Sequence, residues 1–191
     1  MTTLPLVLAS SSPQRRATLE RLGVAFTVRP AAVEELDRGD PGEVALENAL
    51  RKARAARACA PAACEAVLGC DTLVAFGGRI YGKPADAREA RATLEALSGA
   101  THEVVSGLAL LLTDEERTAV ARTAVTFREL DGGLLDWCLT RGEWRGRAGG
   151  YAIQGAGAAL VRMVQGDYEN VVGLPVATLL DVCPELLTVG R

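Results

Sequence analysis

Short apolar runs bounded by turn residues predict the strands of this chain. The first run covers Leu4–Ala9, and a second strand is expected in VAFTVRP, residues 24–30. The strongest run is EAVLGCDTLVAF at residues 65–76, after which GGR turns the chain back toward IYGKP. Two long strands are expected in HEVVSGLALLL (102–112) and RTAVARTAVTFREL (117–130), which are joined by the polar turn TDEE.

Capping residues and apolar periodicity predict the helices. Ser12 as N-cap and Pro13 at the first helical position predict a helix that ends near Gly23. Asp40 and Pro41 start a second, longer helix in the same way. Its expected packing face is an apolar stripe with helical spacing, formed by Leu46, Ala49, Leu50 and Ala53.

The C-terminal half adds further helices and one more strand. Asp86 caps a helix whose buried face is expected to hold Ala90, Leu94 and Leu97. GGLLDWCLTRG predicts a short helix, GRAGGYAIQGAGAALV runs into a strand, and a last helix starts near Pro175. This order predicts an α/β fold with a mixed, partly antiparallel central sheet flanked by helices. At 191 residues, we expect a single domain over 1–191 with two lobes.

Composition narrows the class of protein. A net charge of −3 gives no general attraction to nucleic acid or to an anionic membrane. No apolar stretch approaches the roughly 18 residues of a membrane span, and the first residues lack the basic region of a signal peptide. The five cysteines are scattered and include no CxxC pair, so we expect reduced thiols in a cytoplasmic protein. With a single histidine, only an oxygen-ligated metal remains open.

Three familiar motifs are present only in part. GGRIYGKP matches a P-loop but has proline where that loop needs a hydroxyl for magnesium. GAGAAL lacks the third glycine of a dinucleotide fingerprint and precedes a strand. A nucleophilic triad of Ser10, His102 and Asp71 stays open as an alternative, because sequence does not fix its geometry.

The segment ASSSPQRR carries two arginines in the first turn of a helix. A helix N-terminus already has partial positive charge and favours acidic residues there. Ser10, the free backbone N–H groups and Arg15 together form an anion cradle, whereas an ordinary cap with solvated arginines is the structural alternative.

Other polar residues lie at the ends of predicted elements. Asp71 interrupts a strongly apolar strand, where a carboxylate is costly unless it is paired or bound to metal. Glu35 lies in an acidic loop, Lys52 and Asn48 lie one turn apart on the second helix, and Lys83 lies on a tight turn. Taken alone, Glu35, Lys52 and Asn48 are typical of solvated surface. Together with the amide of Gln154, the charged residues match a magnesium-bound polyphosphate ester, which indicates a nucleotide hydrolase.

Several long segments resemble the Maf family of nucleoside triphosphate pyrophosphatases. LASSSPQRRATLERLGVAF, ENALRKA, LGCDTLV, GKP, LSGATHEVVSGLAL, RAGGYAIQGAGAALV and GDYENVVGLP follow one another in the order seen in that family. The resemblance implies two lobes around a substrate cleft, Mg²⁺ or Mn²⁺ as the metal cofactor, and in many members a homodimer. It also implies hydrolysis of a nucleoside triphosphate to the monophosphate and pyrophosphate, which clears surplus or non-standard nucleotides.

The resemblance also assigns roles by motif. Asp71 resembles the general base, and Glu35 resembles the second acidic residue that helps to hold the metal. Phosphate-side roles fall on Ser10, Arg15, Lys52 and Lys83.

Three positions, Gln14, Thr72 and Gln154, resemble the determinants of base specificity. Thr72 and Gln154 resemble the dTTP/UTP branch of the family. Gln14 matches neither that branch, which usually has arginine there, nor the 7-methyl-GTP branch, which usually has tryptophan. The expected substrates are therefore dTTP and UTP, with 7-methyl-GTP as the alternative. A nucleotide-binding regulator of cell division with little turnover, and a serine hydrolase using Ser10, are alternatives from other classes.

Overall fold

One seven-stranded mixed sheet organises the protein in this computed structural model, which describes residues 6–59 and 66–187. The strand order is β2-β1-β3-β5-β6-β7, and β4 pairs with β3 off this path. β1 (Leu6–Leu8) is parallel to both neighbours, β2 (Phe26–Val28) and β3 (Ala66–Phe76). All other pairings are antiparallel, so the mixed, partly antiparallel sheet expected from the sequence is confirmed.

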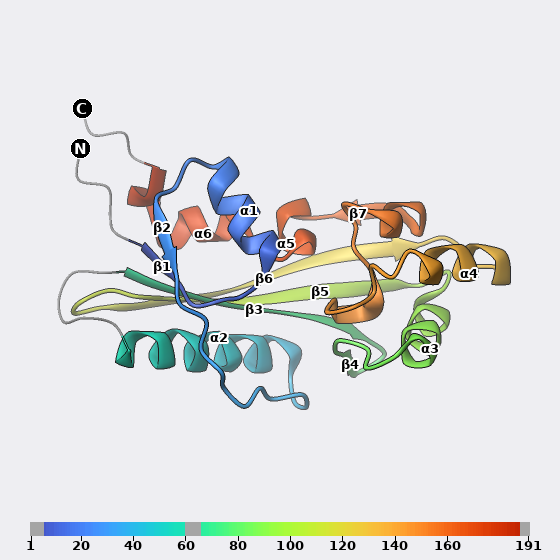
Figure 1. Cartoon of the computed structure of the whole chain (residues 1–191), viewed down its shortest axis with the longest axis horizontal. Helices are drawn as coiled ribbons and strands as arrows, with labels where there is room; N and C mark the ends of the chain where they lie inside the picture. The colour runs from blue at the N-terminus through green and yellow to red at the C-terminus, as the bar shows by residue number, and fades with distance from the viewer. Residues whose placement is uncertain (1–5, 60–65, 188–191) are drawn as a thin grey trace.

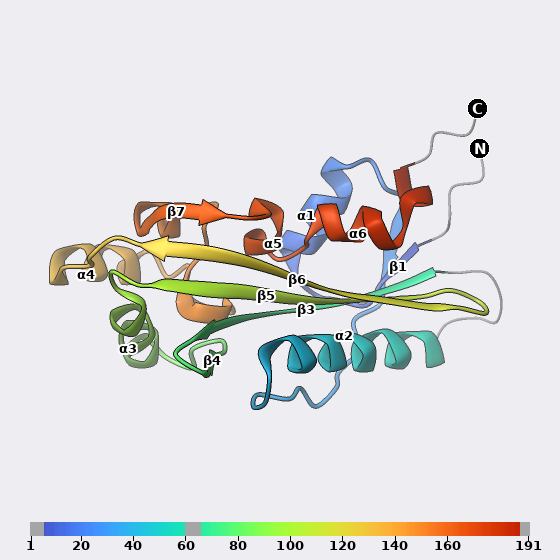
Figure 2. The same cartoon turned by 180° about the vertical axis from the view of Figure 1, so that it is seen from behind.

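Three long strands run along the molecule and carry elements at both ends (Figure 1). They are β3, β5 (Thr101–Leu111) and β6 (Glu116–Phe127). Helix α2 (Pro41–Ala58) lies on one side of them, and α1 (Pro13–Arg21) lies on the other, as the reverse view in Figure 2 also shows.

The shorter elements complete the two ends. Near α1 lie α5 (Tyr168–Val172) and α6 (Val176–Val182), and toward the opposite end lie α3 (Ala87–Leu97), α4 (Gly132–Thr140) and β7 (Val161–Gln165) (Figure 1). β4 (Arg79–Tyr81) forms a hairpin with the end of β3. Short 3₁₀ turns occupy Ala148–Gly150, Ala156–Ala159 and Pro184–Leu187.

Residues that alternate along β3 face opposite sides of the sheet, as strand geometry requires. Val67 and Leu73 join hydrophobic clusters with the α2 side chains, while Leu68 and Cys70 join a cluster with α1 and α6. A further cluster around Phe127 fills the end of the molecule near α3 and α4. The hydrophobic core is therefore split into parts at the two ends of the long strands. The expectation of one domain with two lobes stays a prediction.

Most predicted elements are present, with differences at their ends. The first strand is described only from Leu6, because Leu4 lies outside the described residues, and so does Glu65 at the predicted start of the central strand. Asp40 and Asp86 cap their helices through side-chain hydrogen bonds, as expected. Ser12 occupies the N-cap position of α1, but its hydroxyl makes no cap bond and donates to Gln14 Oε1 (3.1 Å).

The packing face predicted for α2 is wrong in part. Ala49 and Ala53 are fully buried, and the half-buried Leu50 packs against the same hydrophobic cluster, but Leu46 is only half-buried and is not part of that cluster. The α2 backbone lies so close to the sheet that a Cβ at Gly69 of β3 or at Gly107 of β5 would collide with it. The α2 residues that face the sheet at these points are therefore small alanines. This close approach brings the polar side of α2 onto the sheet as well. No helix in residues 6–59 and 66–187 is long and apolar enough to cross a membrane.

Candidate active site

A gap along one edge of β3 positions the site. On that edge β3 pairs with β1 through residues 66–68 and with β4 through residues 74–76, whereas its other edge pairs with β5 along nearly its whole length. Residues 69–73 are therefore left without a strand on the open edge. Asp71 and Thr72 lie within this gap on opposite faces of the strand.

A cavity of about 440 Å³ opens at this gap, a volume within the usual range for small-molecule sites. It collects side chains from both ends of the molecule. Every site residue expected from the sequence lines it: Ser10, Gln14, Arg15, Glu35, Lys52, Asp71, Thr72, Lys83 and Gln154. The structure thus brings together a set that is dispersed over 145 positions of the chain, from 10 to 154.

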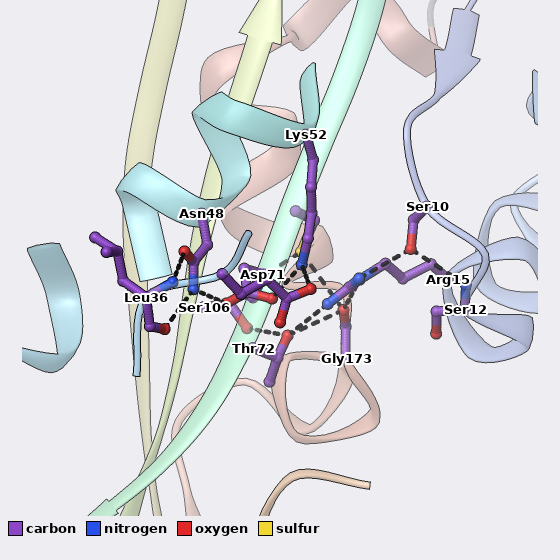
Figure 3. A network of polar contacts seen from close by, with 12 residues as sticks. Ser10, Ser12, Arg15, Leu36, Asn48, Lys52, Asp71, Thr72, Ser106 and Gly173 are labelled. Carbon is purple, nitrogen blue, oxygen red and sulfur yellow. Dashed lines mark hydrogen bonds and ion pairs between the residues drawn. The ribbon is translucent and has the colours of Figure 1, made fainter. Parts of the chain in front are cut away.

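Asp71 is buried and held by two donors from α2 (Figure 3). Lys52 Nζ donates to its Oδ1 at 2.6 Å, and Asn48 Nδ2 donates to its Oδ2 at 3.0 Å. Asn48 and Lys52 are 0 % and 8 % exposed. The interpretation of these two residues as a solvated helix face is therefore wrong, because α2 turns this face toward the open edge of β3.

The same lysine joins the two carboxylates of the site. Lys52 Nζ lies 2.8 Å from Glu35 Oε1 and also pairs with Asp71. Partial burial acts to raise the pKa of Glu35, but the hydrogen bond and charge of Lys52 outweigh that effect. With smaller contributions from Lys83 and Arg15, the pKa of Glu35 is held below its ordinary value of 4.5.

Arg15 is buried on the other side of the gap, and each nitrogen of its guanidinium donates one hydrogen bond to the protein. Its Nε donates to Gly173 O (2.9 Å), Nη1 to Ser10 Oγ (2.9 Å) and Nη2 to Thr72 Oγ1 (3.1 Å). Thr72 also bonds Ser106, its cross-strand partner on β5. The hydroxyl of Thr72 therefore acts on the arginine that supports the cradle, and its effect on a ligand passes through Arg15 (Figure 3).

The nucleophilic triad does not form. His102 Nε2 bonds the hydroxyl of Tyr151 (2.9 Å), and the partners of Asp71 are Asn48 and Lys52. Ser10 Oγ accepts from Arg15 and from the Ser12 backbone N–H. No described residue activates Ser10 as a nucleophile, so the serine hydrolase alternative loses its geometric basis.

Several cavity residues carried no sequence signal strong enough to identify them. The segment 145–148 lines the cavity, and Arg147 Nε is buried with no hydrogen-bond partner among the described residues. Burial lowers the pKa of Arg147, although the nearby Glu143 opposes this. Gly173 contributes only its carbonyl, and α5, which precedes it, is too short to show a helical period. In the sequence, only the family resemblance of the segment GDYENVVGLP pointed to this part of the chain.

The loop that carries Gln154 is fixed from outside the cavity. Glu143 Oε2 accepts the backbone N–H of Ala156 at 2.6 Å. The Gln154 side chain is exposed, lines the cavity and has no hydrogen bond to a described residue. Its amide is therefore available to a ligand, while the backbone beside it is held by another residue.

The donor chemistry fits a hard divalent cation. Glu35 and Asp71 offer carboxylate oxygens that already converge on one positive charge, Lys52 Nζ. Mg²⁺ is commonly held by one or two carboxylates together with substrate phosphates. Among residues 6–59 and 66–187 no group of three or more His, Cys, Asp or Glu gathers as a metal site. A Mg²⁺ ion held by two carboxylates takes its other ligands from water and substrate phosphates.

Comparison with known proteins finds similar sequences over most of the chain and a similar fold. A family model described as Maf-like protein matches residues 5–186. A dTTP/UTP pyrophosphatase of Pyrococcus furiosus is 43 % identical over 177 residues, covering 92 % of each chain. A dTTP/UTP pyrophosphatase of Myxococcus xanthus is 47 % identical over 172 residues, covering 89 % of this chain and 86 % of that protein. The structure of a HAM1 protein from Coxiella burnetii shares the fold, with TM-score 0.55 and 18 % identity over 96 % of this chain and all of that one.

Proposed function

The chain belongs to the Maf family, and from this premise we propose that it hydrolyses dTTP and UTP to the nucleoside monophosphate and pyrophosphate. The observation that carries the proposal is the buried Asp71 carboxylate, held by Lys52 and Asn48 at the open edge of β3, in a cavity that further cations line. A protein that only binds nucleotides has no need of a carboxylate oriented in this way.

In this reaction Asp71 orients a water molecule and accepts its proton as the water oxygen attacks the α-phosphorus. The bond from the α-phosphorus to the bridging oxygen breaks, and pyrophosphate leaves with the electron pair. Arg15, Lys52 and Lys83 bind phosphate oxygens and balance the charge that develops on them. Lys52 is already in hydrogen-bond contact with Asp71, so a phosphate oxygen at the same ammonium group would lie beside the base.

We further propose Mg²⁺ or Mn²⁺ as the cofactor, held by Glu35 and Asp71. The bound metal would polarise the phosphoryl oxygens and neutralise part of their charge. A cytoplasmic location and a homodimer belong to the same proposal. Both come from the family resemblance and the composition.

We assign base recognition to Gln14, Thr72 and Gln154. Gln154 supports the assignment most directly, because its free amide offers both a donor and an acceptor, as a pyrimidine edge requires. Gln14 lines the same cavity, with its Oε1 accepting from Ser12. Thr72 contributes through Arg15. The names of the two relatives favour dTTP and UTP over 7-methyl-GTP.

The test is pyrophosphate release from dTTP, UTP, CTP, GTP and 7-methyl-GTP with Mg²⁺, using native protein and Asp71→Asn. Native protein is expected to release pyrophosphate from dTTP and UTP, and Asp71→Asn to be slower by ~10²–10⁴-fold. If native protein exceeds Asp71→Asn with none of these nucleotides, the enzyme proposal fails and a binding regulator is favoured. Gln14→Arg and Gln14→Trp in the same panel test the role of position 14.

A further inference from the structure

We infer that Asn48 is a positioning residue that fixes the Asp71 carboxylate relative to the loop carrying Glu35. Asn48 is fully buried on α2 and contacts both sides of the site. Its Nδ2 donates to Asp71 Oδ2 (3.0 Å) and to Leu36 O (3.0 Å), and its Oδ1 accepts from Leu36 N (2.7 Å). One amide thus holds the backbone next to Glu35 and one oxygen of the proposed base. The inference rests on the proposed function.

The three bonds fix the orientation of the amide. Rotating the Asn48 amide by 180° would place Oδ1 against two acceptors, Leu36 O and Asp71 Oδ2, and Nδ2 against the Leu36 N–H donor. Only one orientation satisfies all partners. The plane of the Asn48 amide, and with it the direction from which Asp71 Oδ2 is held, is therefore set by the loop backbone.

Lys52 makes a parallel connection, but of a different kind. It bridges Glu35 and Asp71 through charge, and under the proposed function the same ammonium group also binds a phosphate oxygen. Asn48 is neutral, is not among the residues that line the cavity, and donates to the other oxygen of Asp71, so its bonds can stay in place when a nucleotide binds. It thereby keeps the Asp71 carboxylate in one position while Lys52 takes up a phosphate oxygen. An error of about 1 Å in such positioning can slow a reaction by ~10²-fold.

Asn48→Asp and Asn48→Ala test this role by kinetics. Aspartate has the shape of asparagine and still accepts from Leu36 N, but it cannot donate to Asp71 or to Leu36 O and it adds a negative charge beside Asp71, which Asn48→Ala does not. We expect kcat for dTTP to fall by ~10²-fold in both variants, with KM within about threefold, because the phosphate-binding residues are untouched. Values of kcat within about threefold of native in folded variants would overturn the inference. If native protein itself releases no pyrophosphate, the proposed function fails instead.

Two matched controls separate positioning from general damage. Asn170 is also fully buried and donates to Val104 O and Thr123 Oγ1, away from Asp71. Asn170→Ala should lower the free energy of unfolding about as much as Asn48→Ala without the loss of kcat. Arg51 donates to Glu34 O and braces the same loop from its exposed side. Arg51→Met should leave kcat near native if the bond to Asp71 is what matters, and a loss equal to that of Asn48→Asp would contradict this.

The rate of amide hydrogen exchange tests the connection between the loop and α2 without any measurement of catalytic activity. The Leu36 N–H is bonded to Asn48 Oδ1, so its exchange should be at least ~10-fold faster in Asn48→Ala and unchanged in Asn48→Asp. Equal exchange in native protein and Asn48→Ala would overturn the connection between the loop and α2. If Asn48→Ala does not fold, the kinetic test rests on the comparison of kcat between Asn48→Asp and native protein.

Discussion

The residues of this site differ in whether their side chains already have hydrogen-bond partners within the protein. Lys52, Asp71 and Arg15 each have all or most of their polar atoms engaged by the protein. Lys83 and Gln154 are exposed at the cavity without such bonds. The first group is therefore set before a ligand arrives, which is the condition for electrostatic stabilisation without reorganisation. The second group is free to follow the ligand.

Arg147 belongs with the residues that await a partner, and its effect on substrate affinity can be measured. Its buried Nε has no acceptor within residues 6–59 and 66–187, so a ligand oxygen that supplies one would remove a desolvation cost. We expect Arg147→Met to raise KM for dTTP by ~10-fold or more, which corresponds to a charged hydrogen bond of about 1.5–3 kcal/mol. Arg147→Lys should recover only part, because lysine has charge but no Nε.

Arg141→Met is the control for Arg147→Met. Arg141 is exposed, lies on the same connecting segment and packs over the ring of Trp137 outside the cavity lining. Steady-state kinetics of both variants should show a change of KM in Arg147→Met only. An unchanged KM in Arg147→Met would remove this residue from the binding site.

At the scale of elements, the distance between α2 and the sheet decides whether the site exists. Gly69 and Gly107 lie directly beneath the α2 backbone at Ala49 and Ala45. Because α2 also carries Asn48 and Lys52, a helix that moved away from the sheet would withdraw both donors from Asp71. These two glycines are thus as relevant to the chemistry as residues that contact the ligand.

Gly69→Ala is therefore expected to lower both stability and activity. The added methyl group would meet the Ala49 carbonyl, and such overpacking costs about 1–3 kcal/mol of the free energy of unfolding. Displacement of α2 should also reduce kcat, which urea unfolding and pyrophosphate release would measure together. Gly132→Ala is the matched control, because a Cβ at Gly132 meets nothing within 4 Å and its φ is not positive. A native kcat in Gly69→Ala would contradict the dependence on α2.

Elements also show how far the sequence alone could go. The apolar runs and the Asp40 and Asp86 caps were sufficient for β3, α2 and α3, because these signals are local. The packing face of α2 was not predictable in full, since Leu46 and Leu50 have the stronger hydrophobic signal. The glycines that let small alanines pack instead lie on other elements. Asn48 is buried because α2 lies so close to the sheet, and no pattern in the sequence of α2 predicts this burial.

The site residues divide in the same way. Asp71 was identifiable because a carboxylate in an apolar strand is unusual whatever its neighbours are. Arg147 and Gly173 were not, because an arginine in a polar segment and a glycine before proline are common, and only the folded chain brings them to the cavity. The family resemblance supplied roles for residues whose local sequence was uninformative, such as Glu35.

For the molecule as a whole, the end around Phe127 contains a buried histidine that links stability to pH. His102 is 1 % exposed, stacks edge-on against Phe127 and Tyr151, and bonds the Tyr151 hydroxyl. Burial lowers the pKa of His102 to about 4 from 6.5. Its Nδ1 has no partner in the part of the chain that the structure describes, which fits a neutral ring with the hydrogen on Nε2.

The folded protein should therefore lose stability as the pH falls through 6.5. Between pH 6.5 and about 4 the unfolded chain binds a proton at His102 that the folded chain does not, so stability rises with pH in this window. The expected loss is ~2 kcal/mol of the free energy of unfolding between pH 7.5 and pH 5. His102→Gln, which retains a donor for Tyr151, should have a flatter pH dependence in urea titrations. Equal slopes in the two proteins would contradict the assignment.

The loop at Gln154 has a consequence for how such a protein can change over evolutionary time. Its backbone is held by Glu143, while the side chain at 154 faces the cavity and holds nothing in place. Under the proposed role of Gln154, a substitution there would alter the surface offered to a nucleobase with little penalty to folding. Base preference can then drift by single steps while the hydrolytic apparatus on α2 and β3 is inherited unchanged, so that one scaffold can give rise to enzymes for different nucleotides.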